Sequence, residues 1–268
     1  MRSPGVSLGG LTAREVMVKT FPSVGSRDLV TKARAIMRET GWRILPVVDG
    51  GMLEGIITQR EILRVSSTRS NIPVSGIMSI VPVLITPATE LKRVVKALID
   101  FGLDGLPVVM DQTNRTIVGM IRAEDIMQRL VELSSLKVKV EDIMTRDPVV
   151  CSPEDEIVKI WEIMEKSHFS GVPVVEVRGG KKIVIGMITR SDIIREGSAR
   201  LSEESRKERK TKVRSVMKSP AVTIEQDSEV VQAMRLMLER KIKRLPVVKN
   251  GELVGIVSRE DILKMICR

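Results

Sequence analysis

The sequence predicts an α/β fold of the α+β kind, built from four β-α-β-β-α repeats that pack as two pseudo-symmetric pairs. Three observations predict this fold. A Pro-Val-Val strand segment occurs four times, at Pro46, Pro107, Pro173 and Pro246. Each copy leads through a turn to a strand that ends in glycine and two apolar residues. Each copy also follows a stretch with the 3.6-residue apolar period of an amphipathic helix.

The repeats divide nearly the whole chain. A unit of about 50 residues is too small to bury a generous core alone, so we expect each repeat to pack against a neighbour. The predicted segments are a flexible leader 1–10, repeats 11–65, 74–130, 139–196 and 213–267, and a charged linker 197–212 before the last repeat.

Each repeat opens with a short segment, called the head here, that ends in an apolar residue and a methionine. The four endings are Val16-Met17, Ile77-Met78, Ile143-Met144 and Val216-Met217. A short β-rich segment follows each head, at 22–24, 81–85, 148–150 and 220–224.

An amphipathic helix is predicted next in every repeat, and its apolar face is expected to pack in the core. The residues predicted on these faces are Leu29, Ala33, Ile36 and Met37; Leu91, Val95, Leu98 and Ile99; Ile157, Trp161 and Met164; and Val230, Met234, Met237 and Leu238.

The Pro-Val-Val strand then turns back on itself. Asn250-Gly251 favours a two-residue type I′ hairpin, and Asp49-Gly50-Gly51 and Gly179-Gly180 are comparable turn sequences.

Composition narrows the class of protein. Apolar residues make up 43% of the chain, and no apolar run approaches the roughly 20 residues that cross a bilayer. The start of the chain has no apolar signal-peptide core, so we expect a cytoplasmic protein. Cys151 and Cys267 are far apart and are interpreted as small buried hydrophobic residues.

The chain contains no recognisable catalytic motif. It lacks a P-loop, a nucleophile elbow and a dinucleotide-binding fingerprint, and His168 is its one histidine. A single histidine makes neither a catalytic triad nor a metal cluster. We therefore expect no enzyme activity, no catalytic cofactor and no metal site.

The end of the hairpin carries the candidate chemistry, in the pattern Gly-h-h-Thr/Ser-x-x-Asp, where h is apolar. Thr189 with Asp192 and Ser258 with Asp261 match it fully. The second copy has Arg122 in place of the hydroxyl residue before Asp125. The first copy ends in Glu61.

This recurring unit resembles the CBS-domain family, named for cystathionine β-synthase. The resemblance covers residues 12–267 and implies that two repeats join through their sheets into a Bateman module. It further implies that two modules can form a flat disc, within one chain or through a homodimer. The regulatory γ subunit of AMP-activated protein kinase is similar in having four repeats.

The motif favours an adenosine-containing ligand. Helix N-termini attract phosphate, and a carboxylate in the first turn can accept both hydroxyls of a ribose. The predicted ribose residues are Asp192, Asp261 and Asp125. The predicted phosphate residues are Thr189, Ser191, Ser258, Arg122 and, by the resemblance, Arg244. The predicted adenine wall comprises Val149, Val150, Pro173, Ala221, Val222 and Pro246.

The same residues have a purely structural interpretation, because Ser/Thr-x-x-Glu/Asp at a helix start is also a capping box. Thr58 and Glu61 fit the capping interpretation best. For Thr189 with Asp192 and Ser258 with Asp261 the resemblance favours ligand binding.

The predicted function is that of a non-catalytic regulatory protein which binds AMP, ADP or ATP between paired repeats and signals to a protein partner. Two alternatives stay open. The net charge of +10 and the basic linker favour a nucleic-acid-binding or scaffold protein. The same clefts could instead serve a sensor of S-adenosylmethionine.

Overall fold

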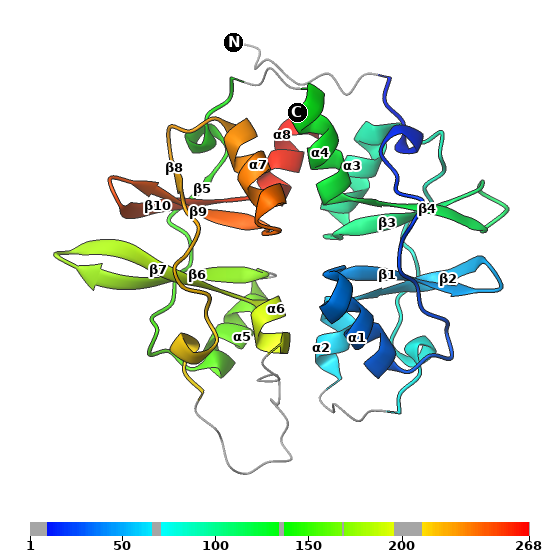
Figure 1. Ribbon diagram of the computed structural model, residues 1–268, viewed down its shortest axis with the longest axis horizontal. Coiled ribbons are helices and arrows are strands. Elements are labelled where there is room, and N and C mark those ends of the chain that lie inside the picture. The colour runs from blue at the N-terminus through cyan, green and yellow to red at the C-terminus, as the bar shows by residue number, and fades with distance from the viewer. Residues whose placement is uncertain (1–9, 66–70, 134–136, 168, 196–210, 268) are drawn as a thin grey trace. The chain divides into compact units, whose positions relative to one another are not determined.

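The computed structural model describes residues 10–65, 71–133, 137–167, 169–195 and 211–267 (Figure 1). The chain divides into two compact units. Unit 1 is Met1–Ser135 with Leu263–Arg268 and holds repeats 1 and 2, whereas unit 2 is Leu136–Ile262 and holds repeats 3 and 4. This division confirms the predicted pairing of the repeats. Almost all of the predicted leader and linker, and His168, lie outside the described residues.

Unit 1 contains two copies of the same order of elements. Its elements are α1 (Val30–Thr40), β1 (Ile44–Asp49), β2 (Met52–Thr58) and α2 (Gln59–Arg64), then α3 (Leu91–Asp100), β3 (Gly105–Val109), β4 (Ile117–Arg122) and α4 (Ala123–Leu133). Short 3-10 helices, η1 (Ala13–Glu15) and η2 (Val74–Gly76), form the two heads.

Unit 2 repeats this order. Its elements are η3 (Val140–Asp142), β5 (Thr145–Arg146), α5 (Ile157–Lys166), β6 (Gly171–Arg178), β7 (Lys181–Thr189) and α6 (Arg190–Arg195), then η4 (Val213–Ser215), β8 (Ile224–Glu225), α7 (Val230–Glu239), β9 (Arg244–Lys249) and β10 (Glu252–Ser258). The last helix, α8 (Arg259–Cys267), begins in unit 2 and ends in unit 1.

The predicted hairpin turns are confirmed. Asp49 pairs with Met52 and Lys249 with Glu252, which leaves two-residue loops. The loop residues Gly50 and Gly51 have φ angles of 56° and 81°, and Asn250 and Gly251 have 51° and 78°. Two consecutive positive φ angles are the requirement of a type I′ turn, which glycine and asparagine meet with little strain.

The first β segment of every repeat is shorter than predicted. Three of the segments make single parallel bridges, Val24 to Val47, Ile85 to Val108 and Cys151 to Val174. In repeat 4 the segment lengthens to β8, which pairs with β9. The β-α-β-β-α order is nevertheless retained, since each parallel bridge is followed by a crossover helix.

The helices mostly bury the predicted faces. Residues 0 to 5% exposed include Ala33 and Met37 of α1, Leu91, Val95 and Leu98 of α3, and Val230, Met234 and Met237 of α7. Leu29 is 41% exposed because it is the N-cap of α1 and not part of its first turn. Trp161 is only partly buried and packs at the edge of its core.

Each head packs on the other repeat of its unit, an arrangement that the sequence did not predict. In unit 1 the amide of Val74 donates to the carbonyl of Asp28, and Ser79 pairs with Ile56. In return Ala13 donates to Thr89, and Val18 pairs with Met120. The boundaries 11–65 and 74–130 stay predictions, and each head lies against the repeat on the other side of that division.

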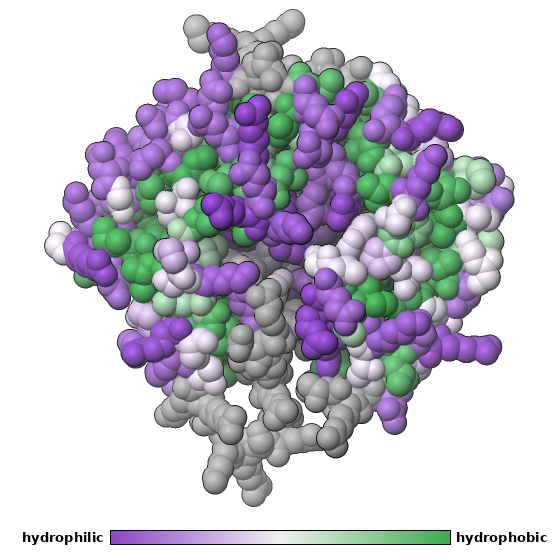
Figure 2. Space-filling model, viewed as in Figure 1, coloured by the Kyte–Doolittle hydropathy of each residue, from purple (hydrophilic) through white to green (hydrophobic). Residues whose placement is uncertain are grey.

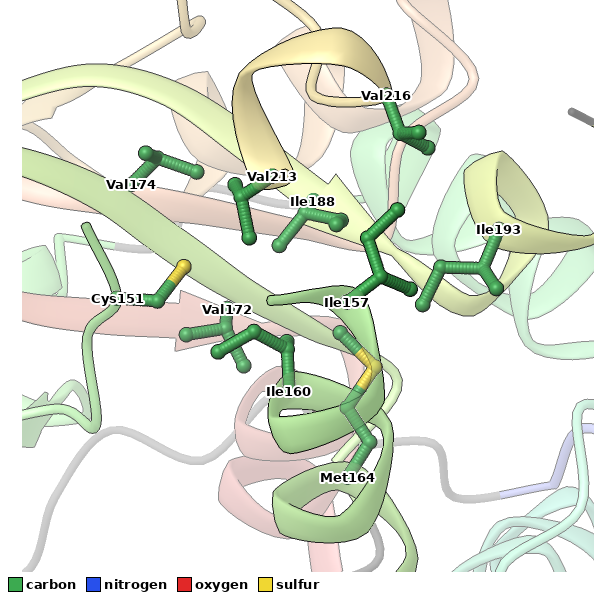
Figure 3. Close-up of a cluster of buried hydrophobic side chains, with 10 residues drawn as sticks. All are labelled: Cys151, Ile157, Ile160, Met164, Val172, Val174, Ile188, Ile193, Val213 and Val216. Atoms are coloured by element: carbon green, nitrogen blue, oxygen red, sulfur yellow. The ribbon is translucent and has the colours of Figure 1, made fainter. Parts of the chain in front are cut away.

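Unit 2 exchanges its heads in the same way. Val213 donates to Asp155 of repeat 3, and Val140 donates to Ser228 of repeat 4. Figure 3 shows Val213 and Val216 of the fourth head directed into a cluster formed by α5, β6 and β7. The core of repeat 3 is therefore completed by residues of repeat 4.

The two hairpins of unit 1 lie back to back, with α1 and α2 beyond one hairpin and α3 and α4 beyond the other (Figure 1). A second core fills the space between the hairpins and includes Ile44, Leu53 and Ile56 from repeat 1 with Val109 and Met120 from repeat 2. Unit 1 thus has a core within repeat 1 and a second core between its two repeats, in keeping with the small size of one repeat.

The motif glycine is where the exchanged head touches the sheet. A methyl group on Gly55 would lie 2.8 Å from the carbonyl oxygen of Ser79 and 3.2 Å from the sulfur of Met78. On Gly186 it would lie 2.8 Å from the carbonyl oxygen of Lys218 and 3.1 Å from the sulfur of Met217. The glycine thus permits the close backbone approach expected of it, and the approaching group is another part of the protein.

Replacement of Gly55 by alanine is expected to destabilise unit 1 by about 1–3 kcal/mol, because the added methyl group overpacks a contact made with backbone. Urea unfolding measures the change. The matched control is Gly76→Ala, whose methyl group would meet only the Ile72 side chain at 3.4 Å. Equal stability of the two variants would contradict the role given to Gly55.

Cys151 is 3% exposed, and burial raises the pKa of its thiol to about 12. At pH 8 the folded protein should therefore keep Cys151 protonated and unreactive toward a disulfide reagent. A Cys267→Ser variant isolates this thiol for the measurement. Reaction should become rapid in urea, and a rapid reaction without urea would show that the site is open.

Candidate functional site

The four motifs occupy the same place in each repeat, where the second strand of the hairpin enters the following helix. In all four copies the acid folds back onto its own strand end, and in the second copy the backbone amide of Arg122 donates to Asp125 at 2.9 Å. The backbone amides of Thr58, Thr189 and Ser258 donate to Glu61, Asp192 and Asp261 at 2.8, 3.0 and 2.8 Å. The capping box predicted for Glu61 is confirmed. The same bonds form at Asp192 and Asp261. The presence of the cap therefore does not distinguish the capping interpretation of a motif from the ligand-binding interpretation.

Asp192 is the most buried of these acids, with 3% of its surface exposed. Thr189 engages its Oδ2 atom through both the amide and the hydroxyl. Its Oδ1 atom is buried and accepts no hydrogen bond from the described residues. The Nζ atom of Lys218, from the exchanged head of repeat 4, lies 3.4 Å from Oδ1 as an ion pair.

Arg244 reaches from repeat 4 into the same area. Its guanidinium donates to the Gly171 carbonyl at 2.9 Å and to the Ser170 hydroxyl at 2.7 Å. A methyl group on Gly171 would lie 3.1 Å from Thr189 Cγ2 and 3.4 Å from Arg244 Cδ. The predicted phosphate residue Arg244 therefore lies beside the Thr189 motif of repeat 3 while holding the two repeats together.

Arg244 also lies opposite Ser258 of its own hairpin. Ser258 donates its hydroxyl to Asp261 at 2.6 Å, and both residues are partly exposed. Ser191, which was predicted to contact phosphate, lies in the first turn of α6 and is partly exposed. Unit 2 thus brings together Thr189, Asp192 and Arg244 from two repeats.

The second copy is arranged differently. Arg122 donates to Asp125 Oδ2 through Nε at 2.9 Å and to Asp125 Oδ1 at 2.6 Å, so both carboxylate oxygens are engaged within the motif. The guanidinium also stacks over the Trp42 ring of repeat 1, 4.2 Å from its centroid. The predicted ribose and phosphate residues of this copy hold each other in a paired state.

The predicted adenine residues lie on two segments that cross between the repeats of unit 2. Val149 and Val150 follow β5, which pairs with β10 of repeat 4, and then Cys151 donates to the carbonyl of Pro173. Ala221 and Val222 follow Lys218, which pairs with Met187 of repeat 3, and lead into β8. Val149 is 42% exposed, whereas Pro173 and Pro246 are buried.

Sequence analysis did not identify Lys218, Ser170 or Trp42 as site residues. The position of Lys218 can be recognised in the sequence, because it directly follows the methionine that ends the fourth head. Without the exchange of heads, that position would lie next to its own repeat and not beside Asp192.

Among the described residues, no group of three or more His, Cys, Asp or Glu side chains could hold a metal ion. None of the described helices has the length and apolar character needed to cross a membrane.

The CBS domain family matches residues 13–68, 74–132, 140–199 and 213–268. These matches cover all four repeats, and the chain belongs to the CBS-domain family.

Two relatives from one organism match most of this chain. Protein MJ1404 of Methanocaldococcus jannaschii is 31% identical over 265 residues, which are 94% of this chain and 61% of that protein. This chain therefore spans less than two thirds of that relative. Protein MJ1225 of the same organism is 24% identical over 272 residues, which are 92% of this chain and 95% of the relative.

Solved structures show the same fold over the whole chain. The crystal structure of MJ1225, described as a candidate archaeal homolog of g-AMPK, has a TM-score of 0.80 at 22% identity and covers 95% of this chain and 99% of its own. A protein from Pyrococcus horikoshii has a TM-score of 0.67 at 18% identity and covers 96% of this chain and 100% of its own. The resemblance to the γ subunit architecture is confirmed at the level of fold.

The Arg122–Asp125 pair yields a prediction about stability. Asp125→Ala should destabilise unit 1 by about 2 kcal/mol, because it leaves a half-buried guanidinium without its charge-assisted bonds. Urea unfolding measures this loss. The control is Asp100→Ala, which removes an exposed pair with Lys96 and should change stability by less than about 0.5 kcal/mol. Similar losses in both variants would contradict a structural role for Asp125.

Proposed function

We propose that this protein is a non-catalytic regulator that binds an adenosine nucleotide, AMP, ADP or ATP, in unit 2 at a site around Asp192. CBS-domain pairs are ligand-binding regulatory modules. The observation that carries the choice of site is the buried Oδ1 atom of Asp192, which accepts no hydrogen bond from the described residues. Asp261 offers a second site built on the same motif.

A ribose is a suitable partner for this carboxylate. The Lys218 ammonium lies 3.4 Å from the buried Oδ1 atom, which accepts no hydrogen bond from the described residues. A ribose hydroxyl would donate the missing hydrogen bond, a contact worth about 1–3 kcal/mol at a charged group. Oδ2 is already held by Thr189, so the carboxylate is fixed in orientation before the ligand arrives. A preorganised acceptor spends less entropy on binding than a mobile one.

The basic groups suit the phosphate of the same ligand. Arg244 and Lys218 belong to repeat 4, whereas Thr189 and Asp192 belong to repeat 3. Both cations lie beside the Thr189 motif across the interface between the repeats. A ligand that touches Asp192 and either cation would therefore contact both repeats. Such a ligand binds best to one packing of the pair, and this difference in affinity shifts the population toward that packing. The shift is the signal to a protein partner.

Isothermal titration calorimetry of the full chain with AMP, ADP and ATP tests the proposal. Asp192→Asn should weaken nucleotide binding at least about tenfold, because the amide replaces an acceptor for ribose hydroxyls with a donor. The amide oxygen can still accept from Thr189, so the helix start is preserved. Saturating nucleotide, at 100 times its Kd, should stabilise the folded protein by about 2.7 kcal/mol.

Glu61→Gln is the matched control, since it makes the equivalent change at the capping box of repeat 1 and should leave nucleotide binding unchanged. Absence of heat and of thermal stabilisation with all three nucleotides would refute the proposal. Binding that survives Asp192→Asn would move the site to another cleft. Binding of S-adenosylmethionine in place of the nucleotides would identify the alternative ligand.

The nucleic-acid alternative rests on the basic stretch 197–212, of which only residues 211 and 212 are described. Figure 2 shows hydrophilic and hydrophobic side chains interspersed on the visible face of the described residues. That alternative therefore stays a prediction, and a mobility-shift assay at low salt is its test.

A further inference from the structure

One position of the exchanged head meets the motif of the other repeat in all four copies. It is the residue directly after the head methionine. Its carbonyl oxygen lies 2.8 to 3.1 Å from the point where a methyl group on the motif glycine would stand. The residues at this position are Val18, Ser79, Thr145 and Lys218, which approach Gly119, Gly55, Gly255 and Gly186.

The side chain at this position faces the second oxygen of the motif acid in two copies. Ser79 Oγ lies 3.5 Å from Glu61 Oε1, and Lys218 Nζ lies 3.4 Å from Asp192 Oδ1. The backbone contact is common to every copy, whereas the side chain differs. In these two copies the position therefore brings a different side chain from the opposite repeat to the motif acid.

Lys218 gives the Asp192 site a cation that the other three copies do not receive at this position, since Val18, Ser79 and Thr145 are neutral. Its side chain is 57% exposed, while Asp192 is 3% exposed. The ammonium thus lies at the boundary between a buried carboxylate and solvent. An ammonium group has three donors and can approach Asp192 and a ligand anion together.

We propose that Lys218 determines the charge of the ligand at the Asp192 site, selecting a phosphorylated adenosine over an uncharged nucleoside or a sulfonium. This inference rests on the proposed function and specifies its ligand class. A phosphate that extends toward solvent from a ribose on Asp192 would gain a charge-assisted bond from Lys218. A sulfonium in the same place would meet a like charge, which acts against the wrong ligand.

Arg244 is not expected to select the ligand by charge in the way proposed for Lys218. Its guanidinium donates to Gly171 and Ser170, so its direction is set by the interface between the repeats. It supplies a fixed positive field, whereas Lys218 carries a compact charge on a flexible stem that can follow the phosphate.

The test compares three probes, AMP, adenosine and S-adenosylmethionine, by calorimetry on the full chain. Lys218→Met removes the charge and keeps the unbranched stem. It should weaken AMP binding about tenfold and change adenosine binding by less than about twofold. S-adenosylmethionine should bind the variant at least as well as the unsubstituted protein. Lys218→Arg should keep AMP affinity within about threefold, since the charge is retained.

Lys159→Met is the matched control. Lys159 lies on α5, its side chain is 65% exposed, and it forms an ion pair with Asp155, which precedes the helix. It should leave the affinities for all three probes unchanged. Thermal unfolding of both variants reports whether each one folds.

Equal losses for AMP and adenosine in Lys218→Met would overturn the inference and leave the proposed function standing, because the residue would then act only on the fold. Unchanged AMP affinity in that variant would overturn it as well. Failure of the unsubstituted protein to bind any of the three probes would overturn the proposed function and this inference together.

Discussion

The structure depends on the contact between each head and the glycine at the end of the second strand in the other repeat. At Gly255 a methyl group would lie 2.7 Å from the sulfur of Met144 and 2.9 Å from the carbonyl oxygen of Thr145. Only glycine lets the two backbones come this close. The contact lets one repeat complete the core of the other, so a repeat too small to be stable alone becomes half of a stable unit.

The packing of each head on the other repeat also places it beside the candidate site residues. The strand end that receives the head is the same strand end that enters the helix with the motif acid. A change in the packing of one head therefore moves a side chain beside Asp192 or Glu61. The four copies share one backbone arrangement and differ in a few side chains.

Much of the fold could be predicted because its signals are local. Asn250-Gly251 forms its turn through its own φ angles, and the face of α7 follows from a period within one helix. The capping box at Glu61 needs only a four-residue segment. The site was harder, because Arg122 could be read as a phosphate residue from its position, yet it pairs with Asp125 and stacks on Trp42 of another repeat.

The sequence by itself determined the repeat, its elements, their turns and the residues that begin each second helix. These properties arise from interactions within a few residues, where periodicity and backbone preference are sufficient. Only the tertiary structure decided which head belongs to which core, and so which side chain faces which acid. Lys218 and Asp192 are 26 positions apart in the chain and meet through a crossing that both repeats must fold to form. No local preference encodes such a crossing, because its energy comes from burial shared between two repeats.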